Sequence, residues 1–224
     1  MPKSGPRATT HSKATVIRLS HLLATSTKHP APPEAPLPVI RTADRSDAGP
    51  LSRLAEATFR STFGAVNSPQ DMALHCQVSY SEAIQAGEIA NPDMLTLLCD
   101  GDEGLVGFAQ LRWDGAPDCV AAQSPGEIQR LYVADAWHGK GIAQGLMHAC
   151  IEALQARNSD VAWLGVWERN PRAIAFYRKC GFVGVGDHVF PLGSDPQRDI
   201  VMARSIAGPS SNIAPQRGTS GERP

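Results

Sequence analysis

Hydrophobic and polar positions follow two different periods along the chain, and the change between them predicts the order of helices and strands. Leu51, Leu54, Ala55 and Phe59 recur at helical spacing, and short apolar runs bounded by Asp, Gly and Pro indicate strands. The predicted strands are 38–41, 94–99, 105–113, 127–133, 161–166, 182–189 and 199–203. Predicted helices open at about Pro50, at Ser68-Pro69, at 142 and at Asn170-Pro171.

This order predicts an α/β fold. A helix at 142–154 joins the strands 127–133 and 161–166, as in a parallel crossover. The hairpin around 100–104 and the two final strands pair antiparallel with their neighbours, so the sheet should be mixed. Residues 37–205 are predicted to form one domain. The basic, Pro-rich segment 1–36 is predicted to be a disordered tail, with a transit peptide as the alternative, and 206–224 a second tail.

Composition excludes several classes of function. With 42% hydrophobic residues, 19% charged residues and a net charge of −1, the chain resembles an ordinary globular protein, and no basic stripe predicts nucleic acid binding. The five cysteines are odd in number and form no CxxC pair, so we expect no disulfide framework, no metal site and a reducing cytoplasm. No apolar run approaches the roughly 20 residues that cross a bilayer, so no membrane partner is expected.

The first chemical feature is the turn Trp137-His138-Gly139-Lys140-Gly141-Ile142-Ala143 between a strand and a helix. Glycines let a ligand approach the backbone, and the first N–H groups of a helix attract a phosphate. The turn matches neither a Walker loop nor a Rossmann fingerprint. A tight connection with no ligand is the alternative interpretation.

Together with the preceding Glu127–Val133, this turn resembles the acetyl-CoA signature of the GNAT superfamily of N-acetyltransferases. The family pattern falls on His138, Gly141 and Ala143, and His138 departs from the usual Gln or Arg. The resemblance implies a GNAT fold, a mixed and mostly antiparallel sheet of about seven strands flanked by about four helices. It also implies that acetyl-CoA lies against the backbone of Leu131, Tyr132 and Val133 and against residues 138–143, namely His138, Gly139, Lys140, Gly141, Ile142 and Ala143.

A second segment, Trp163–Tyr177 followed by Gly181-Phe182, resembles the family's Asn cap and Ala-x-x-Phe-Tyr helix. The resemblance makes Tyr177 the general acid that protonates the departing CoA sulfur. It assigns Asn170, Ala173 and Phe176 to CoA binding. A packed aromatic side chain is the alternative for Tyr177, and helix capping is expected of Asn170 in either case.

Acetyl transfer needs a neutral amine, and Glu127 resembles the family's acid that removes the proton, directly or through water. A surface glutamate at a strand start is the alternative. A strand amide, of Leu131 or Tyr132, would meet the charge that develops on the thioester oxygen. The family forms no covalent acyl-enzyme, so direct attack by the amine is implied.

The resemblance covers about residues 38–205 and is nearest to the bacterial polyamine-acetyltransferase-like branch, on Phe59–Gly64, His188–Gly193 and Asp199. It implies a primary amine acceptor, either a small polyamine-like molecule or a peptide or protein amine. Glu82, Glu88 and Asp199 are the acids available to bind it. A non-catalytic acyl-CoA sensor of the same fold is the main alternative, a nucleotide-binding protein a weaker one, and a homodimer is left open.

Overall fold

The computed structural model describes residues 38–192 and 195–207, which form seven strands, five α-helices and two 3₁₀ turns. The predicted tail 1–36 lies outside the described residues, as does most of the predicted tail 206–224. The strands are β1 (Val39–Thr42), β2 (Met94–Gly101), β3 (Gly104–Arg112), β4 (Pro125–Val133), β5 (Val161–Trp167), β6 (Val183–Leu192) and β7 (Asp195–Ser205). The helical elements are η1 (Arg45–Asp47), α1 (Ala48–Phe63), α2 (Pro69–Tyr80), α3 (Glu82–Ala90), η2 (Asp135–Trp137), α4 (Ile142–Ala156) and α5 (Pro171–Lys179).

All seven strands belong to one sheet in the order β1-β2-β3-β4-β5-β7-β6. Only β4 and β5 pair parallel, through the crossover that contains α4, and the other neighbours are antiparallel. This confirms the predicted mixed, mostly antiparallel sheet. Helix α3 was not predicted, and it adds to the four helices that the sequence pattern indicates.

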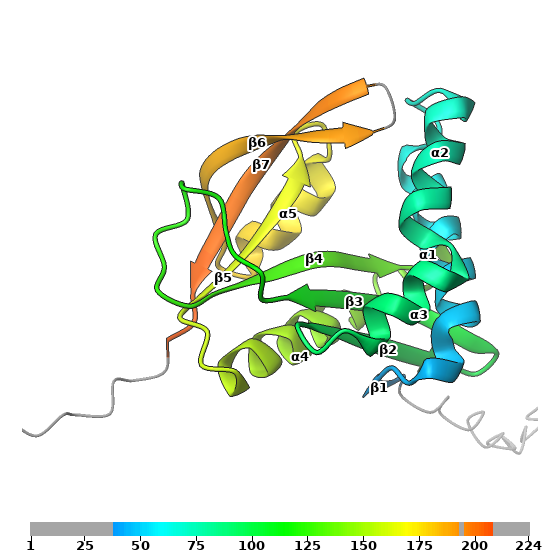
Figure 1. Ribbon diagram of the computed structural model, residues 1–224, viewed down its shortest axis with the longest axis horizontal. Helices are drawn as coiled ribbons and strands as arrows, with labels where there is room; N and C mark the ends of the chain where they lie inside the picture. Colours follow the sequence, from blue (N-terminus) through cyan, green and yellow to red (C-terminus); the bar gives the residue numbers. More distant parts are fainter. Residues whose placement is uncertain (1–37, 193–194, 208–224) are drawn as a thin grey trace, which may run out of the picture. The chain divides into compact units, whose positions relative to one another are not determined.

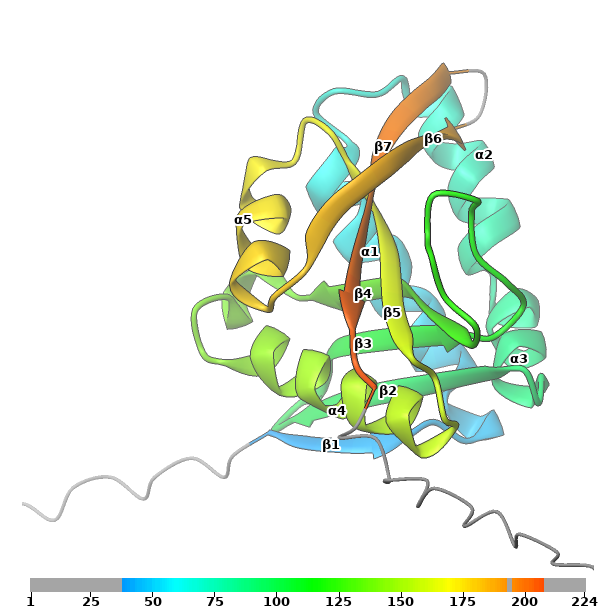
Figure 2. The ribbon, with the colours of Figure 1, turned by 90° about the vertical axis from the view of Figure 1, so that its left-hand side faces the viewer.

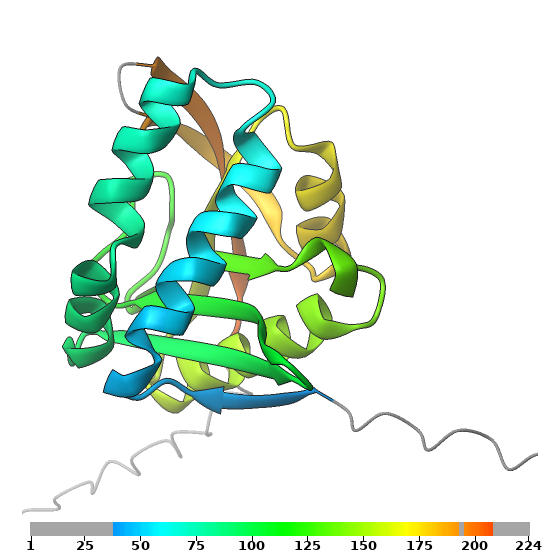
Figure 3. The ribbon, with the colours of Figure 1, turned by 90° about the vertical axis from the view of Figure 1, so that its right-hand side faces the viewer.

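Helices cover both faces of the strands β2, β3 and β4. Figure 3 shows α1 lying across one face, and Figure 2 shows α4 across the other. The core on the α4 side includes Leu146, Leu154 and Leu164, whereas Leu51, Leu98 and Phe108 fill the α1 side. Strands β2 and β3 are therefore buried on both faces, which explains their continuous apolar runs.

The parallel pair β4–β5 is short. Its register contains three residue pairs, from Pro125↔Val161 to Glu127↔Trp163, and beyond them the two strands diverge (Figure 1). Strand β5 pairs with β7 along its whole length, but from Leu164 onward it has no partner on the β4 side, while β4 continues along β3. A gap therefore opens in the middle of the sheet at the carboxyl end of β4.

Glycine allows close packing where the two strands are still paired. A Cβ atom at Gly126 would overlap a methyl group of Leu154, which is fully buried in α4. Helix α4 can therefore lie directly against the paired end, which fixes the point at which the strands begin to separate.

Candidate active site

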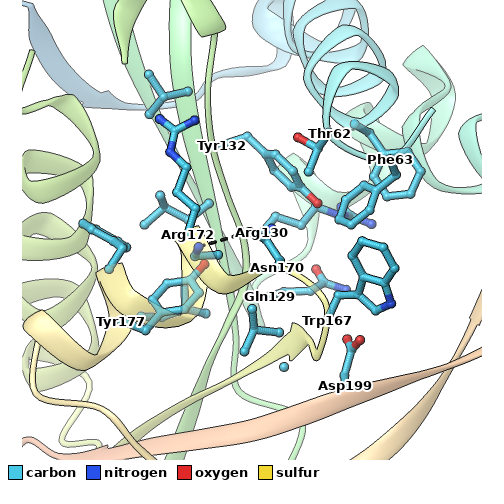
Figure 4. A pocket seen from close by; sticks show the side chains of 18 of the residues that line it. Thr62, Phe63, Gln129, Arg130, Tyr132, Trp167, Asn170, Arg172, Tyr177 and Asp199 are labelled. Atoms are coloured by element: carbon cyan, nitrogen blue, oxygen red, sulfur yellow. Dashed lines mark hydrogen bonds between the residues drawn. The ribbon is translucent and has the colours of Figure 1, made fainter. Parts of the chain in front are cut away.

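The gap between β4 and β5 leads into a cavity of about 600 Å³. One side is formed by the carboxyl end of β4, the turn before α4 and the first turns of α5. The other side is formed by α1, α2 and the end of β6. Figure 4 shows side chains from both sides directed into this space, including Tyr177 from α5 and Asp199 from β7.

The glycine turn lies at one edge of the cavity. Gly139 and Gly141 have φ angles of 78° and 82°, a region that side chains disfavour. Gly141 is the N-cap of α4, and no side chain caps the N–H groups of the first turn. These N–H groups carry the positive end of the helix dipole, which suits an anion.

Of the six predicted residues in this turn, the structure places His138, Gly139 and Ala143 on the cavity wall. The His138 ring Nε2 lies 2.8 Å from the carbonyl oxygen of Val133, which accepts the hydrogen bond and holds the turn against β4. The other three residues do not line the cavity. Lys140 Nζ lies 4.4 Å from the ring centre of Trp137, Gly141 supplies the turn, and the Ile142 side chain is in the core.

Strand β4 carries a bulge where it enters the cavity. Arg130 faces Gln110 and Ile128 faces Leu111, so Gln129 is the extra residue. Gln129 Oε1 is buried and accepts no hydrogen bond from the described residues. The bulge bends β4 away from β5. It brings the predicted residues Leu131, Tyr132 and Val133 to the cavity wall, where these residues have no strand partner on the β5 side.

Helix α5 contributes the predicted Asn170, Ala173, Phe176 and Tyr177, all of which line the cavity. The Asn170 side chain accepts a hydrogen bond from the Ala173 N–H at 3.1 Å, so its predicted capping role is confirmed. Burial raises the pKa of Tyr177 well above its ordinary value of 10. Its hydroxyl therefore stays protonated at neutral pH and can donate a proton inside the cavity.

Glu127 is not brought to this cavity. It lies on the paired end of β4, with Oε2 3.0 Å from Arg112 Nε, and it does not line the wall. Burial raises the pKa of Glu127, while Arg112 opposes the shift. The structure therefore does not place it together with Tyr177.

Asp199 is the carboxylate that the structure does bring to the cavity. It pairs with Trp167 across β5 and β7, and its Oδ2 lies 3.9 Å from His188 Nε2. Burial raises the pKa of Asp199 from 3.8 to about 6, although His188 opposes the shift. Glu82 and Glu88 do not line the cavity, and Glu88 pairs with Arg130 at 2.7 Å.

Other wall residues were missed by the sequence interpretation. Arg172 and Gln144 belong to the first turns of α5 and α4 and line the cavity. The signal for Arg172 was present, since a basic residue follows the Asn170-Pro171 helix start. Gln129 and Arg130 carried no signal, because a bulge has no distinct sequence pattern.

Within residues 38–192 and 195–207, no group of three or more His, Cys, Asp or Glu side chains is arranged to hold a metal ion. All five cysteines are free thiols. No helix in this part of the chain has the length and apolar character needed to cross a membrane.

Comparison with known proteins identifies the class. Residues 59–182, from α1 to the start of the last hairpin, match the profile of the acetyltransferase (GNAT) family. The chain belongs to this family. This GNAT protein is 32% identical over 153 residues to an uncharacterised N-acetyltransferase from the pepI 3′ region of Lactobacillus delbrueckii subsp. lactis, covering 68% of this chain and 88% of the relative. It is 30% identical over 161 residues to an uncharacterised N-acetyltransferase of Mycobacterium tuberculosis, covering 72% and 99%.

Solved structures agree on the fold. The PaiA N-acetyltransferase of Thermoplasma acidophilum, determined in complex with coenzyme A, superposes with a TM-score of 0.59 at 22% identity, covering 75% of this chain and 98% of the other. The ribosomal-protein-S18-alanine N-acetyltransferase of Escherichia coli gives a TM-score of 0.58 at 17% identity, covering 80% and 99%. The predicted GNAT fold is confirmed. Family membership also confirms the predicted enzyme class, an N-acetyltransferase that uses acetyl-CoA as co-substrate.

Proposed function

We propose that this GNAT protein transfers the acetyl group of acetyl-CoA to a primary amine that attacks the thioester directly, with no covalent enzyme intermediate. The observation that carries the proposal is the cavity in the divided sheet. An uncapped helix N-terminus and the protonated hydroxyl of Tyr177 lie on its wall, and a carboxylate, Asp199, lies opposite. Acyl transfer to an amine needs these three groups: an anion site, an acid and a group that takes up a proton.

The residues present fit acetyl-CoA, which supplies an activated acetyl group. The N–H groups that open α4 at Gly139–Ala143 would bind its pyrophosphate, with Arg172 as a further cation beside them. The free backbone edge of β4 at Leu131, Tyr132 and Val133 would pair with the amides of the pantetheine arm. An N–H of the same strand, of Leu131 or Tyr132, would stabilise the charge on the thioester oxygen.

Two carboxylates compete for the role of proton acceptor. Glu127 remains the acid that the family resemblance implies, but its ion pair with Arg112 lies outside the cavity. Asp199 lines the cavity, and with a pKa of about 6 it is ionised at neutral pH but still basic enough to take up a proton. We therefore assign the role of proton acceptor to Asp199. Replacement by the neutral amide discriminates the two, because Asp199→Asn should lower kcat/KM about 100-fold and Glu127→Gln only slightly.

The proposal is tested by following release of the CoA thiol from acetyl-CoA in the presence of primary amines. Tyr177→Phe should lower kcat by about 10² or more, because the departing sulfur loses its proton donor, while the affinity for acetyl-CoA measured by calorimetry stays unchanged. Lys179→Gln is the control, since Lys179 lies exposed on the same helix outside the cavity. A Tyr177→Phe enzyme with the rate of the wild type would remove this residue from the mechanism.

A non-catalytic acyl-CoA sensor is the alternative function. It would bind acetyl-CoA tightly and release no thiol with any amine, which the same assay detects. The polyamine-type branch, a cytoplasmic location, a homodimer and the lack of a nucleic acid partner remain predictions from the sequence.

A further inference from the structure

One region of the cavity is lined by aromatic side chains from α1, α2, β5 and β6. We call this region the aromatic end, and its members are Phe59, Phe63, His75, Tyr80, Trp167 and Phe190. The rings contact one another in a continuous group. Ring centres lie 4.4 Å apart for Phe59 and His75, and 5.7 Å apart for Phe63 and Trp167.

Half of these rings are available to a ligand. Phe59, His75 and Tyr80 are buried, whereas Phe63, Trp167 and Phe190 are only partly buried. Figure 4 shows Phe63 and Trp167 on the same side of the pocket, with Asp199 below Trp167. An occupant of the aromatic end would therefore bury apolar surface against ring faces and edges while it reaches the carboxylate.

The charges around this end allow for one cationic group. Among the described residues that line the cavity, Asp199 is the only carboxylate. Arg130 also lies on the wall, and its charge is balanced by Glu88 at 2.7 Å. His75 adds no positive charge, because burial lowers its pKa to about 4.

We propose that the acceptor of this enzyme is a monoamine with an aromatic body, whose ammonium group binds at Asp199 and whose ring packs in the aromatic end. This inference rests on the proposed function and specifies its substrate class. It departs from the polyamine acceptor that the sequence resemblance implies.

A polyamine fits these surroundings poorly. Its second and third ammonium groups would lose their hydration and face mainly aromatic rings. Asp199, the single carboxylate on the wall, would already bind the first ammonium group. Ring faces attract a cation, but by less than the loss of its hydration when no carboxylate is near. An aromatic body loses water favourably at the same place.

The experiment compares 2-phenylethylamine with ethylamine and spermidine in the thiol-release assay on the full chain. We expect kcat/KM for 2-phenylethylamine to exceed each of the other two by about tenfold or more, because only this amine has a ring that buries apolar surface in the aromatic end. Phe63→Ala should reduce the ratio between 2-phenylethylamine and ethylamine toward one. Asp199→Asn should lower kcat/KM for both amines.

Two controls remove comparable groups outside the cavity. Leu74→Ala shortens an exposed apolar side chain on α2, and Asp187→Asn neutralises an exposed carboxylate on β6. Both should leave the ratio and the rates unchanged. Circular dichroism of each variant verifies that the fold is retained.

Failure of the inference and failure of the proposed function are distinguishable. A rate for spermidine equal to or above that for 2-phenylethylamine would overturn the inference and leave the acetyltransferase activity standing. If no amine is acetylated, the proposed function fails. Calorimetric titration of the same amines into the CoA-bound protein then tests the inference separately. Tighter binding of 2-phenylethylamine would support the aromatic end as its binding site, and tighter binding of spermidine would overturn the inference.

Discussion

Asp199→Asn should make the protein more stable and less active. Asp199 lies on β7 opposite Trp167 of β5, and the partial burial of its carboxyl group in the cavity wall raises its pKa from 3.8 to about 6. In the unfolded chain the group ionises near 3.8, so between these two values the folded protein keeps a proton that the unfolded chain releases. Raising the pH therefore favours unfolding until both states are ionised.

The size of the effect follows from the shift. A difference of about two pH units corresponds to about 3 kcal/mol at pH 8. One side of the carboxyl group faces the cavity, whose water screens the charge, so we expect about half of this value. Asp199→Asn should thus raise the free energy of unfolding by about 1.5 kcal/mol at pH 8, and by about 0.5 kcal/mol at pH 4.5.

Urea denaturation followed by circular dichroism at the two pH values measures these differences. Asp187→Asn is the control, because Arg198 lowers the pKa of this exposed carboxylate and its loss should not stabilise the protein. If Asp199→Asn does not raise the free energy of unfolding at pH 8, or raises it equally at both pH values, the argument that burial disfavours the ionised carboxylate is refuted. A stabilised variant that kept full activity would instead remove Asp199 from proton transfer.

Three further substitutions test other parts of the structure. Gly126→Ala should lower the free energy of unfolding by about 2 kcal/mol, because the new methyl group has no room beside α4. Gly87→Ala in α3 is the control, since its methyl group meets no atom and should raise the free energy of unfolding by about 0.5 kcal/mol. Chemical denaturation measures both values, and equal effects would contradict the packing at Gly126. Gly141→Ala should weaken acetyl-CoA binding in calorimetry by about tenfold, since a side chain at a φ of 82° costs about 1–2 kcal/mol, and unchanged affinity would show that the turn does not form the anion site. Arg130→Met leaves the half-buried carboxylate of Glu88 without its cationic partner, so thermal unfolding should show a loss of about 3 kcal/mol, which a second change, Glu88→Gln, should partly restore.

Local features of the fold were predictable because their causes are local. The caps at Ser68 and Asn170 follow from side chains that bind the backbone three residues on. Helix α3 was missed because its buried face is polar. Gln85 is fully buried there and binds Glu88, so the apolar repeat that marks α1 is absent.

The site was predictable where it is continuous in sequence, as in the turn at Gly139 and the helix that carries Tyr177. It was not predictable where side chains from distant segments meet. The rings of Phe63 and Trp167 lie about a hundred residues apart in the chain and touch only because β5 turns away from β4 toward α1. The position of Glu127 depends on where the strands cease to pair, which no residue pattern marks.

Within the described residues, three residue pairs and the adjoining hydrogen bond from the Asp160 N–H to the Ser124 carbonyl oxygen form the backbone link between the β1–β4 side of the sheet and the β5–β7 side. Such a narrow junction predicts two cooperative units in native-state deuterium exchange, one on each side of the seam. A pantetheine arm bonded along β4 would extend that seam, so a bound donor should slow exchange in β5 and β7 as well as at its own contacts. Binding of the donor in the cavity and stabilisation of the β5–β7 side of the sheet would then be thermodynamically coupled.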